Sequence, residues 1–218
     1  TVSSLRNRGR CVGDPGKTRL SQRRKGAKSA RSAPPARVAL FRNGIMLHVA
    51  LLEPEIPPNT GNIARLCAAT GAALHLIGRL GFRLDDRSLR RAGVDYWSAV
   101  DVRRHDCLAD FERFWEAGQP AHGRLFCFTA HATLPYTRVV YQDGDCLLFG
   151  GESNGLPPGL LQRHAERALC IPMPAGQVRS LNLATAVGIA LYEALRQLNA
   201  HQLQPENPIL KVPFVFPC

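Results

Sequence analysis

The sequence lacks the short cysteine spacings that indicate a structural metal site or a redox pair. The seven cysteines, at positions 11, 67, 107, 127, 146, 170 and 218, include no Cys-x-x-Cys pair and are odd in number. Most lie inside apolar runs, where cysteine behaves as a small hydrophobic residue. We therefore expect reduced core cysteines. The histidines show no ligand spacing either, so we expect no metal site, and His75 is interpreted as a core residue with satisfied hydrogen bonds.

Long apolar runs are also missing from the sequence. None approaches the roughly 20 residues that a membrane-spanning helix needs, and no basic-then-apolar leader precedes a cleavage site. Together with the reduced cysteines, these absences predict a soluble cytoplasmic protein without membrane contact.

Several common catalytic signatures are absent as well. The sequence contains no Gly-x-Ser-x-Gly motif, no Walker lysine and no evident Ser-His-acid order. No Gly-x-Gly-x-x-Gly follows the first predicted strand, which argues against a dinucleotide-dependent oxidoreductase. The chemistry must therefore be sought in other motifs.

The net positive charge of the chain is concentrated in its N-terminal 45 residues. Residues 1–45 contain twelve lysines and arginines and a single acid, Asp14, whereas residues 46–218 contain sixteen residues of each sign. The formal net charge of +11 is therefore that of the first 45 residues. This segment has no apolar periodicity, and we predict a disordered basic arm. A role in RNA binding, a targeting role and an extension without a role all stay open.

Alternating strands and helices predict an α/β fold from Met46 onward. Short apolar segments predict strands at 46–52, 73–77, 125–129, 145–149 and 168–171. Helices are predicted from Asn59 or Thr60 to Gly71, and at 85–92, 105–117, 157–165 and 181–198, with a loop at 130–137. This order indicates a parallel sheet with helices on both faces. We divide the chain into the basic arm, 1–45, the α/β domain, 46–199, and a proline-rich tail, 200–218.

Two loops rich in Gly, Pro and small polar residues are the candidate binding site. The first carries Gly150, Gly151 and Gly155, and the second runs from Ile171 to Ser180 into the last helix. Glycines let a ligand approach the backbone, and amides near a helix start bind polar groups. Loops of this kind hold nucleotide-like ligands in many α/β folds. The patterns alone therefore indicate either a site for an adenosine-like ligand or two tight turns.

An arginine lies near the start of the first predicted helix. Asn59, Asn62 and Arg65 recur every three residues and share one face. A cation at this end of a helix opposes the macrodipole, which predicts an anionic partner: a carboxylate such as Glu53, or a substrate phosphate. Four more arginines between Arg83 and Arg91 either contact an RNA backbone or form a solvated helix face.

The last predicted helix is apolar on most sides. Its apolar residues repeat at spacings of three and four: Leu181, Ala184, Gly188, Leu191, Leu195 and Leu198. We expect this helix to be deeply buried or shared with a second subunit in a homodimer.

Several segments, in order, carry a family resemblance. They are Glu53-Pro-Glu-Ile-Pro-Pro-Asn-Thr-Gly-Asn-Ile-Ala-Arg-Leu, Gly81-Phe with Asp85-Asp-Arg, Leu89-Arg-Arg-Ala-Gly-Val-Asp-Tyr, Tyr141-Gln-Asp-Gly-Asp, Phe149-Gly, Gly155-Leu-Pro, Ile171-Pro-Met, Arg179-Ser-Leu-Asn-Leu and Tyr192-Glu-Ala-Leu-Arg-Gln-Leu. Over roughly residues 46–198 they resemble the SPOUT-class tRNA ribose 2′-O-methyltransferases of the TrmL family, which modify the wobble nucleotide.

The resemblance implies a C-terminal trefoil knot that binds S-adenosylmethionine, in a homodimer that acts on tRNA. By position, the residues that match the family's cofactor-contacting sites are Phe128, Gly150, Ile171 and Ser180. Arg65, Glu152 and Asn182 match the residues of its three catalytic motifs. Because a guanidinium is effectively always protonated, we interpret Arg65 as a phosphate anchor that also stabilises the developing alkoxide, with Glu152 and Asn182 orienting the site.

The chain departs from the family pattern in one motif. The family usually has Phe-Gly-Pro-Glu-Thr-Arg-Gly, whereas Gly151, Ser153 and Asn154 replace the Pro, Thr and Arg here. One phosphate or substrate contact is therefore expected to differ. The loop before Ser180 is also one residue longer.

The leading interpretation is S-adenosylmethionine-dependent 2′-O-methylation of the wobble ribose of tRNA, on a cytidine or a modified uridine. The alternatives are the same reaction on another tRNA or rRNA nucleotide, and an RNA-binding relative that has lost catalysis. Retention of Arg65, Glu152, Ser180 and Asn182 argues against lost catalysis.

Overall fold

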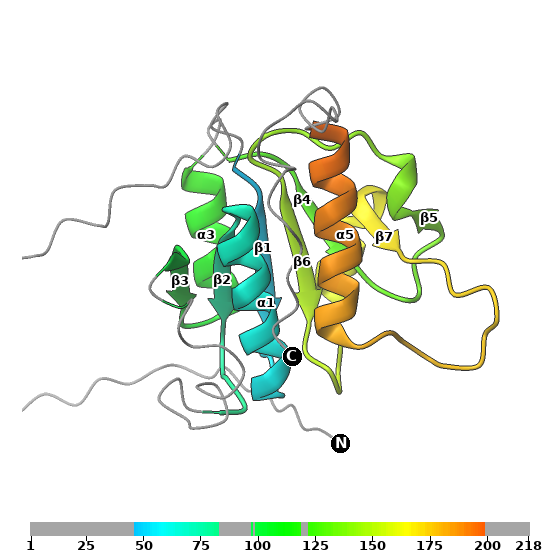
Figure 1. Cartoon of the computed structure of the whole chain (residues 1–218), viewed down its shortest axis with the longest axis horizontal. Helices are drawn as coiled ribbons and strands as arrows, with labels where there is room; N and C mark the ends of the chain where they lie inside the picture. The colour runs from blue at the N-terminus through cyan, green and yellow to red at the C-terminus, as the bar shows by residue number, and fades with distance from the viewer. Residues whose placement is uncertain (1–45, 83–96, 98, 119–121, 199–218) are drawn as a thin grey trace, which may run out of the picture. The chain divides into compact units, whose positions relative to one another are not determined.

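The described part of the chain forms one parallel sheet covered by helices. The computed structural model describes residues 46–82, 97, 99–118 and 122–198, and every structural statement below concerns these residues. The strands are β1 (His48–Leu52), β2 (Ala73–Ile77), β3 (Val102–His105), β4 (Leu125–Phe128), β5 (Leu134–Pro135), β6 (Cys146–Gly150) and β7 (Ala168–Cys170). The sheet order is β3-β2-β1-β6-β4-β7-β5, and each strand pairing in it is parallel (Figure 1).

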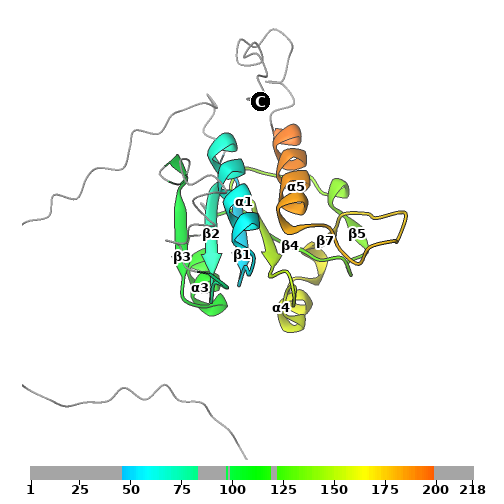
Figure 2. The same cartoon turned by 60° about the horizontal axis from the view of Figure 1, so that its bottom comes forward.

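Helices cover both faces of this sheet, as predicted. They are α1 (Pro57–Thr70), α3 (Leu108–Ala117), α4 (Pro158–Arg163) and α5 (Leu183–Leu198), with short 3₁₀ turns at Tyr136–Arg138 and Ala165–Arg167. Figure 2 shows α1 and α5 on one side of the sheet, and α3 and α4 on the other. Each side has its own core: Ile63 and Val187 belong to the first, Phe111 and Leu160 to the second.

The central strands are apolar throughout because both of their faces are buried. Each residue of β1 and β2 is buried, and β1 pairs in register with β2 on one side and β6 on the other. A strand between two helical layers has no solvent face to mark with polar residues. The predicted core histidine, His75, is confirmed: it is fully buried in β2 and hydrogen-bonded on both ring nitrogens, to His48 and His105.

Two boundaries at helix starts differ from the predictions. Helix α1 begins at Pro57, before the predicted cap at Asn59 or Thr60, because prolines fit the first helical positions, where a backbone N–H has no partner in any case. Helix α5 begins at Leu183 instead of Leu181. The predicted end of α1 is confirmed: Gly71 adopts a left-handed conformation with φ of 76° and donates its N–H to the Cys67 carbonyl.

Strand β3 was absent from the prediction, which extended a helix over 105–117. Residues 102–105 read Val-Arg-Arg-His and form a half-exposed strand that pairs only with β2 within the described sheet, and α3 starts three residues after it. Their strand conformation depends on the neighbour, not on an apolar run. Similarly, the predicted loop at 130–137 contains the two-residue strand β5.

Some predictions fall outside the described residues. They are the basic arm at 1–45, the tail at 200–218, and the helix at 85–92 with its arginines. Among the helices that are described, none has both the length and the apolarity to cross a membrane.

Candidate active site

Three loops at the carboxyl edge of the sheet carry Glu152 and Asn182 and lead into the helix that holds Arg65. The loop after β1 leads into α1, the loop after β6 contains Glu152, and the loop after β7 leads to Asn182 at the start of α5. In open parallel sheets this edge is where ligands bind. The sheet order therefore gathers segments that are far apart in the sequence.

The carboxylate of Glu152 lies at the N-terminus of α1. Its Oε2 accepts the backbone N–H of Glu55 at 2.8 Å, and its Oε1 accepts the N–H of Ile56 at 3.3 Å and the side-chain amide of Asn59 at 2.8 Å. The first amides of a helix have no partners within the helix, and the macrodipole favours a negative charge there. Glu152 is thus held as a fixed carboxylate, consistent with the expected orienting role.

Asn59 connects this carboxylate to the third motif. While its amide nitrogen donates to Glu152, its Oδ1 accepts from the side-chain nitrogen of Asn182 at 2.9 Å. The Oδ1 of Asn182 in turn accepts the backbone N–H groups of Ala184 and Thr185, at 3.0 and 3.3 Å, and so caps α5. A continuous line of hydrogen bonds therefore joins the β6 loop, α1 and α5.

The sequence does not predict this role of Asn59; it predicts Asn59 or Thr60 only as a helix cap. Asn59 is only 5% exposed, and its side chain makes hydrogen bonds to Glu152 and Asn182. The one sequence signal was the spacing of three that it shares with Asn62 and Arg65. That spacing indicated a polar face but gave no partner.

Ser153, one of the three departures from the family pattern, binds Glu55. Its backbone N–H donates to Glu55 Oε1 at 3.0 Å, and its hydroxyl donates to Oε2 at 2.6 Å. The hydroxyl bond, followed by the amide bond, holds the pKa of Glu55 below its ordinary value. The Glu55 N–H also donates to Glu152, so hydrogen bonds run in both directions between the loop after β1 and the loop after β6.

Arg65 lies on the exposed side of α1, six residues after Asn59. The carboxylate first considered as its partner, Glu53, lies against Gly78 at the end of β2: a Cβ built on Gly78 would be 3.0 Å from Glu53 Cγ.

Three of the four expected cofactor residues end neighbouring strands. Phe128 ends β4, Gly150 ends β6 and Ile171 follows β7, and β4 pairs with both other strands. The ring of Phe128 stacks on that of Phe149, with centroids 4.6 Å apart. A Cβ on Gly150 would lie 2.0 Å from the Gly155 carbonyl carbon, so only glycine fits this turn.

The fourth cofactor residue, Ser180, is exposed on the loop that precedes α5. The other three positions, at neighbouring strand ends, fit a nucleoside held at this edge of the sheet. Within the described ranges no group of three His, Cys, Asp or Glu side chains is placed to bind a metal ion.

Comparison with known proteins places the chain in a family. The profile of the SpoU rRNA Methylase family matches residues 46–192, and the chain belongs to this family. The fold is thus that of a methyltransferase class.

Within the class, the chain is similar to enzymes of tRNA. It is 51% identical over 154 residues to the tRNA (cytidine(34)-2′-O)-methyltransferase of Escherichia coli K12, covering 70% of this chain and 94% of that protein. A solved structure from work on the 2-OH methylation of C/U34 on tRNA has a TM-score of 0.66 and 51% identity, over 72% of this chain and 98% of that one. The AdoMet-bound rRNA methyltransferase from Sinorhizobium meliloti is 31% identical, with a TM-score of 0.62, over 73% of this chain and 57% of that one.

Proposed function

We propose that this protein transfers a methyl group from S-adenosylmethionine to the ribose 2′-hydroxyl of the wobble nucleotide of tRNA, a cytidine or a modified uridine. The observation that carries the proposal is the hydrogen-bonded line from Glu152 through Asn59 to Asn182, which fixes the loops of all three motifs beside the expected cofactor positions. The similarity to tRNA methyltransferases over nearly their whole length supports the wobble position as the target.

The residues of this chain would divide the work as follows. Phe128, Gly150, Ile171 and Ser180 would hold S-adenosylmethionine, which supplies an electrophilic methyl group when bound. Transfer requires the 2′-hydroxyl to be held in line with that methyl group.

Arg65, exposed and permanently charged, would bind a phosphate of the tRNA and stabilise negative charge that develops on the attacking oxygen. Glu152 accepts three hydrogen bonds from α1 and its approach, so its role is to keep the loop in place for the ribose. Asn182 orients the start of α5 in the same way.

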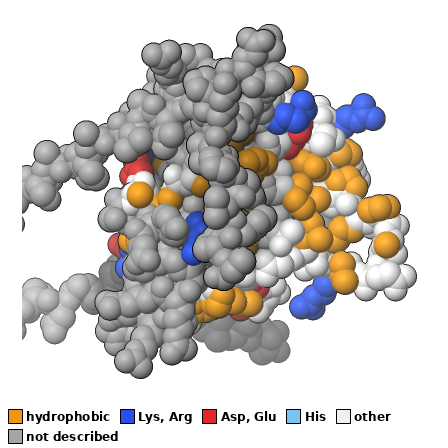
Figure 3. Space-filling view, viewed as in Figure 1, with side chains coloured by type: hydrophobic (Ala, Val, Ile, Leu, Met, Phe, Trp, Pro, Cys, Tyr) orange, Lys and Arg blue, Asp and Glu red, His pale blue; other side chains and the backbone are white. Residues whose placement is uncertain are grey.

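A homodimer is part of the proposal. Tyr192 on α5 is 56% exposed, and Ala184, Ala186 and Leu198 on the same helix are only partly buried. Figure 3 shows hydrophobic side chains gathered on the face that carries α5, β7 and β5. A second copy would cover such a surface. The trefoil knot and a cytoplasmic location, where tRNA is found, belong to the same proposal.

The test is methylation of total tRNA with labelled S-adenosylmethionine, followed by mapping of the modified ribose. Label at the 2′-oxygen of the wobble nucleotide supports the proposal. Label at another tRNA position, or in ribosomal RNA only, would instead support the alternative target. Complete absence of transfer by folded protein that binds tRNA would indicate a relative without catalysis.

A further inference from the structure

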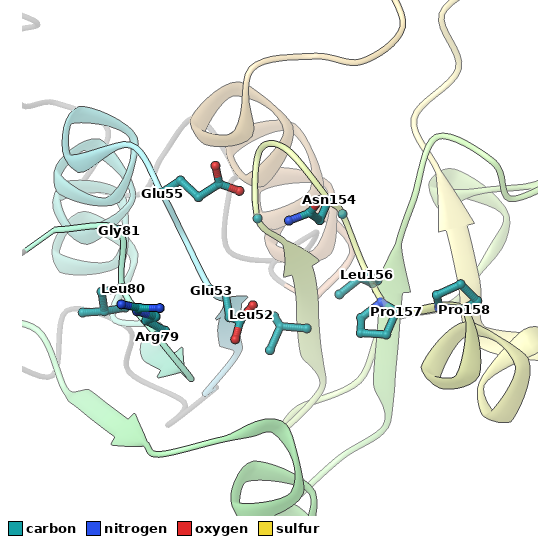
Figure 4. Close-up of a pocket in the computed structure, with 12 residues that line it drawn as sticks. Leu52, Glu53, Glu55, Arg79, Leu80, Gly81, Asn154, Leu156, Pro157 and Pro158 are labelled. Atoms are coloured by element: carbon teal, nitrogen blue, oxygen red, sulfur yellow. The ribbon is translucent and has the colours of Figure 1, made fainter. Parts of the chain in front are cut away.

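A hollow of about 380 Å³ lies beside the motif loops, and none of the expected cofactor residues lines it. It is lined by residues that follow β1, β2 and β6: Leu52, Glu53, Glu55, Arg79, Leu80, Gly81, Gly151, Asn154, Gly155, Leu156, Pro157 and Pro158. Figure 4 shows Glu53 and Arg79 on one side of it and Asn154 on the opposite loop. Its volume is at the lower end of the range for ligand pockets, about 300–1,000 Å³, and suits a single nucleoside.

The backbone of Glu53, at the edge of this hollow, has an unusual conformation. It has a φ of 48°, the one positive φ among the described non-glycine residues. Such a conformation is costly for a residue with a side chain, and it occurs preferentially at functional sites. The N–H of Glu53 donates to the Ile77 carbonyl at 2.8 Å, and its side chain lies against Gly78, where a Cβ would be 3.2 Å from Oε1.

The polar groups in the hollow are available to a ligand. Within the described part of the chain, neither the Glu53 carboxylate nor the Arg79 guanidinium makes a hydrogen bond or an ion pair, and both side chains are exposed. Glu55, in contrast, is already bonded to Ser153. A ligand thus meets one free acceptor and one free cationic donor, between walls formed by leucines and prolines.

This combination favours a base over a phosphate. Two carboxylates beside one guanidinium repel an added anion. A flat base, in contrast, can pack its two faces against the apolar walls while its edge forms hydrogen bonds with the polar side chains. Cytosine presents an amino donor next to ring acceptors, and a carboxylate is the usual acceptor for that amino group. Uracil presents a carbonyl oxygen at the same place, which the carboxylate would repel.

The hollow also borders the loop of the catalytic motif. Gly151 lines it, and the next residue is the motif acid Glu152. Glu55, at its rim, donates its backbone N–H to Glu152. A nucleoside whose base fills the hollow would therefore place its ribose over this loop.

We infer that the hollow holds the base of the methylated nucleotide, with Glu53 accepting from the cytosine amino group and Arg79 donating to the O2 carbonyl, so that Glu53 determines the preference for cytidine over unmodified uridine. The inference rests on the proposed function for its substrate. The test uses the full-length protein and two tRNA transcripts that differ only in a C or a U at the wobble position.

The wild-type protein is expected to methylate the C transcript with a kcat/KM about tenfold higher than the U transcript. Glu53→Gln, whose amide donates to or accepts from either base, should bring that ratio close to one. Arg79→Met should lower kcat/KM on both transcripts about equally, because both bases carry the O2 carbonyl that accepts from Arg79. Glu166→Gln, an exposed glutamate outside the hollow, is the matched control and should leave the ratio unchanged.

Binding of cytidine and uridine monophosphate, followed by NMR, separates this inference from the proposed function. Wild-type protein that prefers the cytidine nucleotide, with the preference lost in Glu53→Gln, but methylates neither transcript contradicts the proposed function alone. Equal use of both bases by the wild type, or an unchanged preference in a folded Glu53→Gln protein, overturns the base pocket. If Glu53→Gln does not fold, an undiminished kcat/KM in Arg79→Met overturns it instead.

Discussion

The side-chain nitrogen of Asn182 donates to Oδ1 of Asn59 at 2.9 Å, although the two residues are 123 positions apart in the chain. Replacing Asn59 by Ala would remove one hydrogen bond from the Glu152 side chain and one from the Asn182 side chain. We expect a loss of about 1–3 kcal/mol in the free energy of unfolding and a large fall in methyl transfer, measured by urea unfolding and by labelled transfer. Asn62→Ala, exposed on the same helix, should change neither. Wild-type activity in Asn59→Ala would show that the line is not needed.

Arg65→Ala should abolish methyl transfer while cofactor binding stays nearly intact. Arg65 lies on α1, whereas the expected cofactor residues follow β4, β6 and β7. Calorimetry with S-adenosylmethionine measures the binding, and Arg104→Ala, an exposed arginine on β3, is the control. Loss of cofactor binding by a folded Arg65→Ala protein would sink the assignment.

Tyr192→Glu should convert a dimer to a monomer. A charge at this exposed position of α5 would lie in the apolar surface that we assign to the partner copy. Light scattering across micromolar concentrations is the measurement, with Glu116→Lys, on α3 at the opposite face of the sheet, as the control. A monomeric mass for the wild type would refute the dimer outright.

Stability should fall as the pH drops below 6.5. Burial lowers the pKa of His75 to about 2 and that of His48 to about 4, with Arg103 and His122 contributing to both shifts. Below pH 6.5 these histidines bind protons in the unfolded chain but stay neutral in the folded protein. Their contribution to the free energy of unfolding is therefore fully present above pH 6.5 and declines below it. Between pH 7.5 and pH 5 we expect a loss on the order of 2 kcal/mol per histidine.

Urea midpoints measured at both pH values check this expectation. His131→Gln, at an exposed position, should leave the pH dependence unchanged. Equal midpoints for the wild type at pH 7.5 and pH 5 would mean that the pKa values of the two histidines are not lowered.

Deleting residues 1–45 should weaken tRNA binding mainly by removing phosphate contacts, since the net charge of the chain belongs to them. The plot of log affinity against log salt should become shallower, by about 0.7–0.9 per lost contact. Cofactor affinity and the methylated nucleotide should not change, because backbone contacts carry no sequence information directly. Identical salt slopes for the two proteins would leave the arm with a targeting role or none.

The sequence was sufficient to predict the strands that are buried on both faces of the sheet. The runs at β1, β2 and β6 are apolar because no solvent face exists, and Gly71 was recognisable because it ends α1 in a conformation that favours glycine. Strand β3 was missed since half-exposed Val-Arg-Arg-His has no pattern of its own and becomes a strand only beside β2.

The candidate site divides in the same way. Glu152 and Asn182 were predicted from their motifs, but not the residue between them, because the bond from Asn59 depends on two helices being brought together by packing. The conformation of Glu53 could not be predicted either, because nothing in the sequence Leu-Glu-Pro indicates a φ of 48°. Contacts between distant segments are a property of the folded sheet and have no local signature.

The pairing of β1 with both β2 and β6 has a consequence for biosynthesis. Pairing with β2 completes one edge of β1 soon after it is made, but its other partner begins at Cys146, nearly a hundred residues later. At about 5–20 residues per second, translation leaves that edge without its partner for roughly 5–20 s. The nascent chain thus carries an open, apolar strand edge for that time, and it is during synthesis, more than in the finished protein, that this sequence would need a chaperone.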